Sequence, residues 1–528
     1  MDIDLIIKNY RCFQDSSPAR IAIRRGFTAF IGTNNSGKSS LLRFFYEFRQ
    51  LFQLLSNPSG NFINALQNKD GTMSFPSSVY DREELFANTN DRDLQLEVVF
   101  NQSEPSEQTP DKLILTVYRK ENAWSVEINK QGQKVGIQGG GVFGWQENLL
   151  KTGNHGALDL SQAFVLFSSL SKILYIGPFR NAVNEGTKEN YYDIQIGQSF
   201  IQSWDNYKTG NSKRQSEATY RLTEDIKHIF EFSDFQINPS SDKRTLQLFI
   251  NGKSYMLSEQ GSGLAQFILV LANAAIRQPT YILIDEPELN LHPSLQLDFL
   301  TTLGTYASEG VMFATHSIGL ARSAAERVYS IRRDSSEIRN VTDLESVPSL
   351  SEFLGELSFS GYRDLGFDKI LLVEGPNELK TVQQFLRKFK KDHQVVMLPL
   401  GGASLIKENA ETELEEIKRI SDNVSALIDS EKESKDAELS AERKAFVETC
   451  KKLKINCHVL EKRAIENYMS DRAIKIVMKS DNHKQLESYE SIRTAQFGWA
   501  KSESWKMAKE MTKEEVDGTD LGRFIQAI

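Results

Sequence analysis

Residues Gly32 to Ser39 read Gly-Thr-Asn-Asn-Ser-Gly-Lys-Ser, a spacing of glycines, lysine and serine that suits a phosphate chain. The glycines let backbone N–H groups turn around phosphate oxygens, the lysine neutralises the outer phosphates, and the serine hydroxyl ligates Mg²⁺. An apolar stretch, 27–31, precedes the loop and a helix-forming stretch follows it, which is the context that the motif requires. We therefore predict a nucleoside triphosphate site with these binding residues: Gly32, Asn34, Asn35, Ser36, Gly37, Lys38, Ser39 and Ser40.

Two adjacent carboxylates follow the apolar strand expected at 281–284. Asp285 is placed to join Ser39 in the Mg²⁺ shell, and Glu286 is placed to polarise the attacking water. His316 ends another expected strand, 31 residues after Asp285. A buried core histidine is the alternative for His316, but its position at a strand end favours a catalytic role.

A second acidic set lies in the C-terminal third, where Glu374, Asp429 and Glu431 each follow an apolar stretch. Crossover helices, one of them carrying Glu378, would make these strands parallel and would gather the carboxylates at one sheet edge. Acidic oxygens without Cys or His suit Mg²⁺ or Mn²⁺ and not zinc. Any one of these residues could be a solvated carboxylate, but the set at this spacing predicts a metal site.

The elements that position these residues follow from the hydrophobic pattern. Alternation predicts an early hairpin, an antiparallel sheet over about 93–130, a buried strand within 171–180, and a hairpin turning at Asn251-Gly252 before a long apolar helix. Residues 139–141, all glycine, predict a mobile loop, and about 197–235 reads as a helical insertion, a candidate dimerisation element. We expect an ATPase domain over 1–335, a junction over 336–368 and a second α/β domain with C-terminal helices over 369–528.

Composition limits the class of protein. The 528 residues are 40% hydrophobic and 25% charged, which is ordinary for a globular chain of several domains. The most apolar run, 267–276, is too short for a bilayer, and the acidic start lacks the basic region of a secretion signal. Three cysteines without zinc spacing predict neither disulfides nor structural zinc, so we expect a cytoplasmic protein.

The charge distribution restricts how nucleic acid could bind. The net charge is -8, and residues 371–528 contribute -1 of it, with 27 Lys and Arg against 28 Asp and Glu. A histone-like positive coat is therefore excluded. Any nucleic acid must use local basic patches, which we expect towards the C-terminal end.

The N-terminal landmarks resemble the ABC-type ATPases, specifically their SMC-like branch. Residues 9–13, with Arg11, resemble the opening motif of that branch; Ser262-Gly263 its signature; 288–293 its D-loop; and 314–317 its switch-histidine loop. The resemblance implies ATP sandwiched between two heads, hence a homo-oligomer, dimer or tetramer, with Arg11, Ser262 and Gly263 as nucleotide contacts. Ser258 is an alternative to Ser262, which we favour because it directly precedes the helix.

The C-terminal acidic set resembles the Toprim domain, with Glu431 in place of the second aspartate. An ABC head followed by Toprim resembles the OLD (overcoming lysogenisation defect) family of nucleases. That resemblance implies an α/β fold class: an ABC-type P-loop head with antiparallel β and helical insertions, then a Rossmann-like parallel sheet. It also implies that Glu466, in a segment like the family's acidic IEN motif, is a metal ligand, and that Lys506 stabilises the scissile phosphate, with Lys501 and Lys509 as rivals.

The family resemblance implies an ATP-regulated, metal-dependent endonuclease that cleaves DNA, most simply duplex DNA, with ATP and Mg²⁺ as cofactors and Mn²⁺ as an alternative at the Toprim site. Similar architectures in Gabija and retron-associated systems imply antiphage defence, with a helicase or a reverse transcriptase and its noncoding RNA as a partner. Two alternatives stay open: a nucleic-acid-sensing ATPase scaffold that signals to a partner, and a Toprim RNase acting on tRNA. The acidic set of Glu374, Asp429 and Glu431 speaks against the scaffold, because binding alone does not need metal carboxylates.

Overall fold

The computed structural model divides the chain into two compact units, Met1–His316 with Arg327–Asp343, and Ser317–Glu326 with Leu344–Ile528. We call them the first unit and the second unit. The structure describes residues 3–32, 35–68, 70–71, 73–101, 108–135, 144–152, 156–178, 190–289, 291–333, 339–343, 369–400, 411, 414–415, 417–418, 421, 423–496 and 498–528. The expected glycine loop at 139–141 lies outside these ranges.

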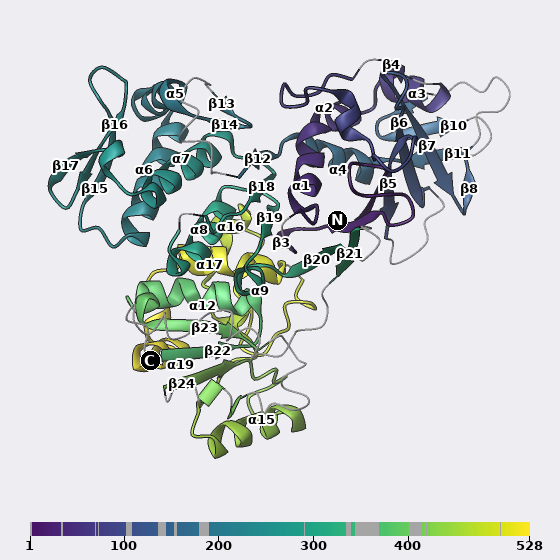
Figure 1. Ribbon diagram of the computed structural model, residues 1–528. Helices are drawn as coiled ribbons and strands as arrows, with labels where there is room; N and C mark the ends of the chain where they lie inside the picture. Colours follow the sequence, from purple (N-terminus) through teal and green to yellow (C-terminus); the bar gives the residue numbers. More distant parts are fainter. Residues whose placement is uncertain are drawn as a thin grey trace. The chain divides into compact units, whose positions relative to one another are not determined.

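A largely parallel sheet forms the centre of the first unit (Figure 1). In spatial order its strands are β12 (Leu174–Ile176), β18 (Tyr281–Asp285), β19 (Gly310–Thr315), β3 (Gly26–Ile31), β20 (Arg327–Arg333) and β21 (Arg339–Asp343). Only β21 pairs antiparallel in this sheet, within the described residues. The β18 and β19 strands are buried along their whole length, and β3 is buried from Phe27 onward, as their continuous apolar sequences predict. β21 falls within the stretch expected to be the junction, because the chain turns back there to pair with β20.

An antiparallel sheet lies in the same unit, as the alternating sequence predicts. In spatial order its strands are β2 (Ala19–Ile23), β1 (Ile3–Lys8), β5 (Leu94–Phe100), β6 (Lys112–Val117), β7 (Ala123–Lys130) and β4 (Asp70–Gly71), with β8 (Gln133–Lys134) beside β7. A small sheet of β9 (Gly144–Gln146), β10 (Leu149–Thr152) and β11 (Gly156–Asp159) follows in the chain. The expected early hairpin is confirmed by the pairing of Ile3 with Ile23.

Helices supply the apolar partners of these sheets. They are α1 (Lys38–Glu47), α2 (Arg49–Leu54), α3 (Gly60–Gln67) and α4 (Ser161–Ser171). Aromatic side chains pack edge to face against α1, for example Tyr10, which follows β1, against Phe44 with ring centroids 5.1 Å apart. Because α1 starts at Lys38, this packing fixes the helix whose first turn carries the phosphate-binding residues.

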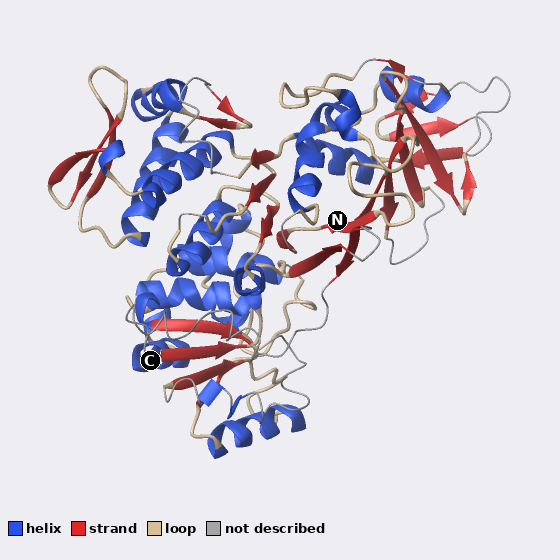
Figure 2. Ribbon diagram, in the orientation of Figure 1, coloured by secondary structure: helices blue, strands red, loops and turns tan. Residues whose placement is uncertain are grey.

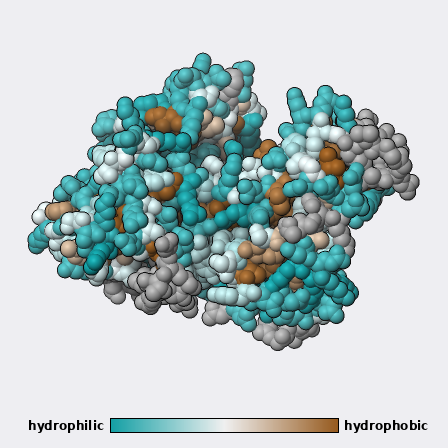
Figure 3. Space-filling view, turned by 90° about the horizontal axis from the view of Figure 1, so that it is seen from above, coloured by the Kyte–Doolittle hydropathy of each residue, from teal (hydrophilic) through white to brown (hydrophobic). Residues whose placement is uncertain are grey.

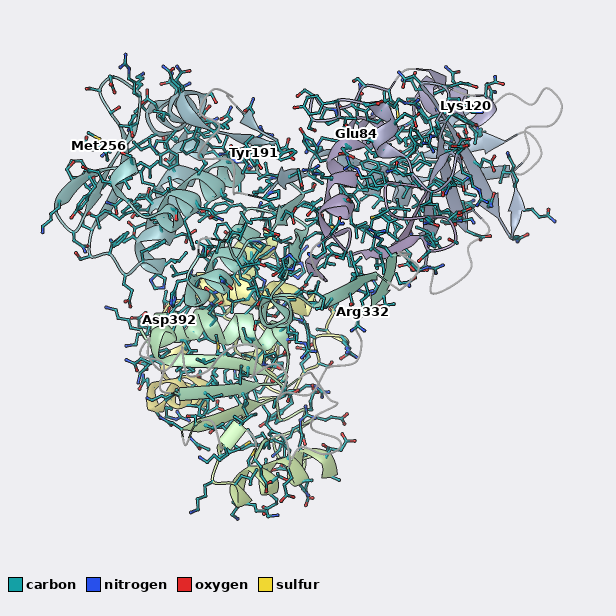
Figure 4. All side chains as sticks on the ribbon, in the orientation of Figure 1. Glu84, Lys120, Tyr191, Met256, Arg332 and Asp392 are labelled. Atoms are coloured by element: carbon teal, nitrogen blue, oxygen red, sulfur yellow. The ribbon has the colours of Figure 1, made fainter. Side chains whose placement is uncertain are left out.

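A helical part with a small sheet interrupts the central strands (Figure 2). It contains the hairpin β13 (Asn190–Tyr191) and β14 (Ile194–Gln195), then α5 (Gly197–Thr209), α6 (Lys213–Ile229), the strands β15 (Phe235–Pro239), β16 (Leu246–Ile250) and β17 (Lys253–Met256), and α7 (Ser262–Arg277). Helices occupy Gly197–Thr209 and Lys213–Ile229 of the stretch expected to be helical, whose end at Phe235 is the start of β15. The predicted turn at Asn251-Gly252 is confirmed. Met256, at the end of β17, is exposed (Figure 4).

The second unit is built on a parallel sheet, as predicted from 369–428. Its spatial order is β23 (Val395–Pro399), β22 (Lys369–Val373), β24 (Val424–Ile428) and β25 (Asn456–Val459). Alternate strand residues such as Ile370, Leu372 and Ala426 share a core with Phe446 and Cys450 of α15 (Ala441–Lys452). The order places the carboxyl ends of β22 and β24 side by side, which decides where their following residues lie.

Further helices lie in the described part of the chain. They are α8 (Pro293–Thr305), α9 (Ile318–Ala324), α12 (Pro376–Lys388), α16 (Asp471–Met478), α17 (Ser504–Glu510), α18 (Glu514–Asp517) and α19 (Asp520–Ala527), with short turns η5 (Ile465–Tyr468) and η6 (Lys501–Glu503). Among the described residues, no helix combines the length and the apolarity that crossing a membrane would need. The face in Figure 3 is mainly hydrophilic, with small separate hydrophobic patches.

Candidate functional site

The glycine loop connects β3 to α1 and demands glycine at two places. A Cβ atom on Gly32 would lie 2.3 Å from the carbonyl oxygen of Ile331 and 2.7 Å from Ser36 Oγ. Gly37 has φ 112° and caps α1, a conformation that other residues rarely adopt. Ser39 and Ser40 stand in the first turn of α1, and Ser36 is buried. Asn35 is described, whereas Asn34 lies outside the described residues.

Lys38 lies at the centre of the expected phosphate site. Its amine donates to the Gly32 carbonyl over 2.8 Å and lies 3.3 Å from His316 Nε2. Burial lowers the pKa of Lys38, and the nearby carboxylates of Asp285 and Glu286 oppose that effect. A cation held in a buried loop among acceptors is suited to a phosphate, which would replace some of these contacts.

Asp285 ends β18 and is 2% exposed. Burial raises its pKa to about 6, and the neighbouring Glu286 adds to the rise. The Ser39 hydroxyl opposes this rise, and apart from it the Asp285 carboxylate has no hydrogen-bond partner in the described part of the chain. Such buried, unpaired oxygens are costly unless a cation compensates them, so Asp285 and Ser39 fit an Mg²⁺ site.

Glu286 and His316 face each other across the ends of β18 and β19. The His316 Nε2 atom lies 3.4 Å from Glu286 Oε1, and the Glu286 backbone N–H donates to the Ala314 carbonyl over 2.8 Å. Glu286 has φ 54°, a strained value that turns its side chain at the end of the strand. Glu288, which has no separate predicted role, contacts the same loop: its Oε1 accepts from Thr315 Oγ1 over 2.7 Å and from the His316 N–H over 2.9 Å. Glu288 therefore holds the histidine loop in place.

Three other residues expected at the nucleotide have defined places. The Arg11 guanidinium contacts Glu47, at the end of α1, over 2.5 Å. Among the described residues, it forms no ion pair with the glycine loop. Ser262 is the first residue of α7 and is exposed, whereas the alternative, Ser258, lies in a short 3₁₀ turn. Gly263 follows Ser262 in the same helical turn.

In the second unit, Glu374 and Asp429 meet at the ends of β22 and β24, as predicted. The Asp429 N–H donates to Glu374 Oε1 over 2.9 Å, and Asp429 is 3% exposed. Arg443, which has no predicted role, lies beside this pair: its Nη2 is 3.0 and 3.2 Å from the two Glu374 oxygens. Its Nε donates to the Asp429 carbonyl over 2.8 Å. Burial raises the pKa of Glu374, an effect that Arg443 opposes.

Glu378 and Glu466 complete a buried acidic cluster with Glu374 and Asp429. Burial first, then the charges of Glu466 and Glu374, hold the pKa of Asp429 well above its usual range. Glu466 lies in η5, is 1% exposed, and its Oε2 has no hydrogen-bond partner among the described residues. Lys501 supplies the counter-charge, with its amine 3.2 Å from Glu466 and 3.7 Å from Glu378.

Two expected residues are placed differently. Lys506 was expected at the scissile phosphate, but its amine contacts Glu503 over 3.0 Å, and it is Lys501 that contacts the acidic cluster. Lys501 lies in η6 and Lys506 in α17, so the two lysines belong to different elements and their amines have different partners. Glu431 pairs with Arg463 over 3.1 Å and is 39% exposed at its side chain, outside the buried cluster.

The donor set of this cluster fits a hard divalent cation, because it offers only carboxylate oxygens and one of them, Glu466 Oε2, is buried and unpaired. Among the described residues, however, no three acidic, His or Cys side chains are already arranged around one point as metal ligands. Arg443 and Lys501 neutralise the carboxylates instead. The residues therefore fit a metal whose binding displaces Arg443 from Glu374.

The chain matches a known protein family and is similar to a known nuclease. A family model described as an AAA ATPase domain matches residues 1–141 and 168–321, more than half of the chain. The Old nuclease of Escherichia phage P2 is 23% identical over 431 residues, which cover 72% of this chain and 69% of that protein.

Solved structures of SMC heads are also similar. The SMC head domain from Thermotoga maritima has a TM-score of 0.33 at 14% identity and covers 66% of this chain and 100% of that one. An Smc head from Pyrococcus furiosus, bound to the C-terminal domain of ScpA, has a TM-score of 0.35 at 11% identity and covers 68% and 99%.

Proposed function

Because the chain belongs to the AAA ATPase domain family, we propose that it is an ATP-regulated, divalent-metal-dependent endonuclease that cleaves DNA. The similarity to the Old nuclease supports joining an ATPase to a nuclease in one chain. The observation that carries the nuclease half is the buried cluster of Glu374, Glu378, Asp429 and Glu466 at the carboxyl edge of a parallel sheet. Its position at the sheet edge and its carboxylate donors support our proposal that it is a Toprim centre.

In the ATPase half, the backbone of the glycine loop and Lys38 bind the phosphates. Ser39 and Asp285 would hold Mg²⁺, since the Asp285 oxygens are buried and otherwise unpaired. Glu286 orients and polarises the water, and His316, 3.4 Å away, contacts both Glu286 and Lys38 and is placed to sense the outer phosphate. Ser262, exposed at the start of α7, completes the site of a second head in a dimer.

In the nuclease half, Glu374, Asp429 and Glu466 would hold the cation, with Glu378 and Glu431 beside them. When bound, divalent cations supply an activated water and stabilise the leaving oxygen in phosphodiester cleavage. Lys501, held on Glu466 and Glu378, takes the role first assigned to Lys506 and stabilises the negative charge that develops on the phosphate. Burial keeps competing water away from the carboxylates.

The biological setting that we propose is antiphage defence in a bacterial cytoplasm. It is supported by the resemblance to Gabija and retron-associated proteins, which also suggests a helicase or a reverse transcriptase with its noncoding RNA as partner. The helical part formed by α5 and α6 is the proposed contact between heads.

Paired variants test the two halves. Asp429→Asn keeps the hydrogen bond from the Ile465 N–H, which Asp429 Oδ1 accepts over 3.0 Å, but removes a ligand charge. We expect it to lower plasmid nicking in Mg²⁺ or Mn²⁺ on the order of 10²-fold or more while ATP hydrolysis stays unchanged. Glu286→Gln should slow ATP hydrolysis while ATP binding is kept, because only water activation is lost.

DNA nicking and phosphate release, measured on the same preparations, test the nuclease assignment and the ATPase assignment separately. Nicking by Asp429→Asn at the wild-type rate would refute the Toprim assignment. If wild-type protein nicks neither DNA nor RNA with any divalent cation, the scaffold alternative is favoured instead.

A further inference from the structure

A cavity of about 180 Å³ opens beside the acidic cluster of the second unit. It contains Glu466, whose buried Oε2 is unpaired in the described part of the chain, and Lys501, which neutralises that carboxylate. Glu431, Glu490, Arg463 and Arg493 also line it. The cavity therefore joins the proposed metal ligands to a set of cationic side chains.

The cations of the cavity differ in what they contact. Arg463 pairs with Glu431 over 3.1 Å, and Lys501 pairs with Glu466 over 3.2 Å. The Arg493 guanidinium has no ion pair or hydrogen bond with any residue that the structure describes, and Arg493 is exposed. Its charge is therefore available to a ligand in the cavity, and no internal carboxylate has to be displaced first.

The backbone around Arg493 is fixed to the segment that carries Glu466. The Asn467 side-chain amide donates to the carbonyls of Glu487 and Glu490 over 2.6 and 2.9 Å, and the Arg463 N–H donates to the Ser488 carbonyl over 2.8 Å. Arg493 follows in a turn closed by the Thr494 N–H on the Ser491 carbonyl. Arg493 is thus held at a set place relative to Glu466 despite its exposure.

We infer that this cavity is a subsite for a phosphodiester of the nucleic-acid strand and that Arg493 is its anchor. The inference rests on the proposed nuclease function and names how that site holds its substrate. A guanidinium fork matches two phosphate oxygens, and a phosphodiester in this cavity would lie next to Glu466 and Lys501. Arg493 contacts substrate away from the reacting atoms, so it is a binding residue.

Strand binding in EDTA, where cleavage cannot occur, tests the anchor. The probes are fluorescein-labelled 30-nucleotide DNA, as single strand and as duplex, and RNA of the same sequence. Arg493→Gln should weaken binding about fivefold to tenfold for every base sequence and reduce the slope of log K against log salt by about 0.7 to 0.9. Arg493→Lys should keep the slope and lose part of the affinity, because the charge stays and the fork is lost.

Arg523→Gln is the matched control, because Arg523 is an exposed arginine of the same unit that contacts Glu461 over 3.6 Å and does not line the cavity. It should leave both affinity and slope unchanged. Equal binding and equal slopes for Arg493→Gln and wild type, or no binding by wild type to any probe, would overturn the subsite. The comparison of DNA with RNA identifies the strand that supplies the phosphodiester.

This result is separable from the proposed function. If Arg493→Gln binds normally while Asp429→Asn loses nicking, the subsite is wrong and the nuclease stands. If Asp429→Asn nicks normally, the nuclease assignment fails, whatever the binding data show.

Discussion

At the scale of single residues, Arg443 changes how the acidic cluster is understood. Its Nη2 is almost equidistant from the two Glu374 oxygens, at 3.0 and 3.2 Å, which is where a bidentate cation would bind. Both side chains are largely buried, at 13% and 14% exposure, so water screens their attraction only weakly. Arg443 therefore competes with a divalent cation for Glu374.

Replacing Arg443 with methionine should tighten Mn²⁺ binding roughly tenfold, because the competing charge is removed and the aliphatic volume is kept. Titration calorimetry with MnCl₂ measures it, and Arg443→Lys, which keeps a cation, is the control. If Arg443 serves instead to orient Glu374, the methionine variant will bind Mn²⁺ more weakly, by about 10- to 100-fold.

At the scale of elements, α19 supports the turn that carries Glu466. Asp520 of α19 accepts from Tyr468 Oη over 2.7 Å, from the Glu461 N–H over 2.9 Å, and contacts His458 Nε2 over 3.1 Å. His458 also stacks on Phe524 with ring centroids 4.7 Å apart. One carboxylate thus joins the C-terminal helix, β25 and η5.

Asp520→Asn should lower the free energy of unfolding at pH 7 by about 2 kcal/mol, since hydrogen bonds to a charged group are lost. Burial alone would raise the pKa of Asp520, but the hydrogen bonds from His458 and Tyr468 outweigh it and lower the pKa to about 2. Since the pKa of an unfolded aspartate is about 3.9, this stabilisation is complete above that pH and is lost as the pH falls towards 2.

The difference between wild type and Asp520→Asn should therefore narrow as the pH falls below about 4. Urea denaturation from pH 7 to pH 3 follows it, with Asp436→Asn, at an exposed position, as the control. A difference that stays constant over this range would show that the carboxylate charge is not involved.

At the scale of the whole molecule, the chain passes from the first unit to the second directly after His316 and returns at Arg327. Within the second unit, the intervening segment packs on α12. Its Glu326 forms an ion pair with Lys380, whose side chain is fully buried, at 0% exposure. A buried ion pair adds little net stability, because desolvation offsets its attraction. Glu326 follows the histidine loop in the chain and Lys380 shares α12 with Glu378, so we propose that the pair serves coupling instead.

The double variant Lys380→Met with Glu326→Gln should change stability little but weaken the effect of ATP on cleavage. The measurement is the ratio of nicking rates with and without ATP, which should move towards one while ATP hydrolysis is kept. An unchanged ratio would show that this pair does not carry the coupling.

The nucleotide site could be predicted from the sequence because its residues are close in the chain or end strands of one sheet. Gly32, Lys38 and Ser39 form one loop, and the apolar strands before Asp285 and His316 can only lie in a buried parallel sheet. The same reasoning predicted that Glu374 and Asp429 lie close together, because neighbouring parallel strands end at the same edge of a sheet.

Only the tertiary structure decided which cations meet the carboxylates. Arg443 lies 69 residues from Glu374 in a charge-mixed helix, where no local pattern separates it from its solvated neighbours. Lys501 and Lys506 have similar surroundings in the sequence. Only the folded structure shows that Lys501 contacts Glu466 whereas Lys506 contacts Glu503. Which side chains of distant segments meet depends on the order of the strands and on how the helices pack against the sheet. The spacing of residues within either segment does not determine that packing.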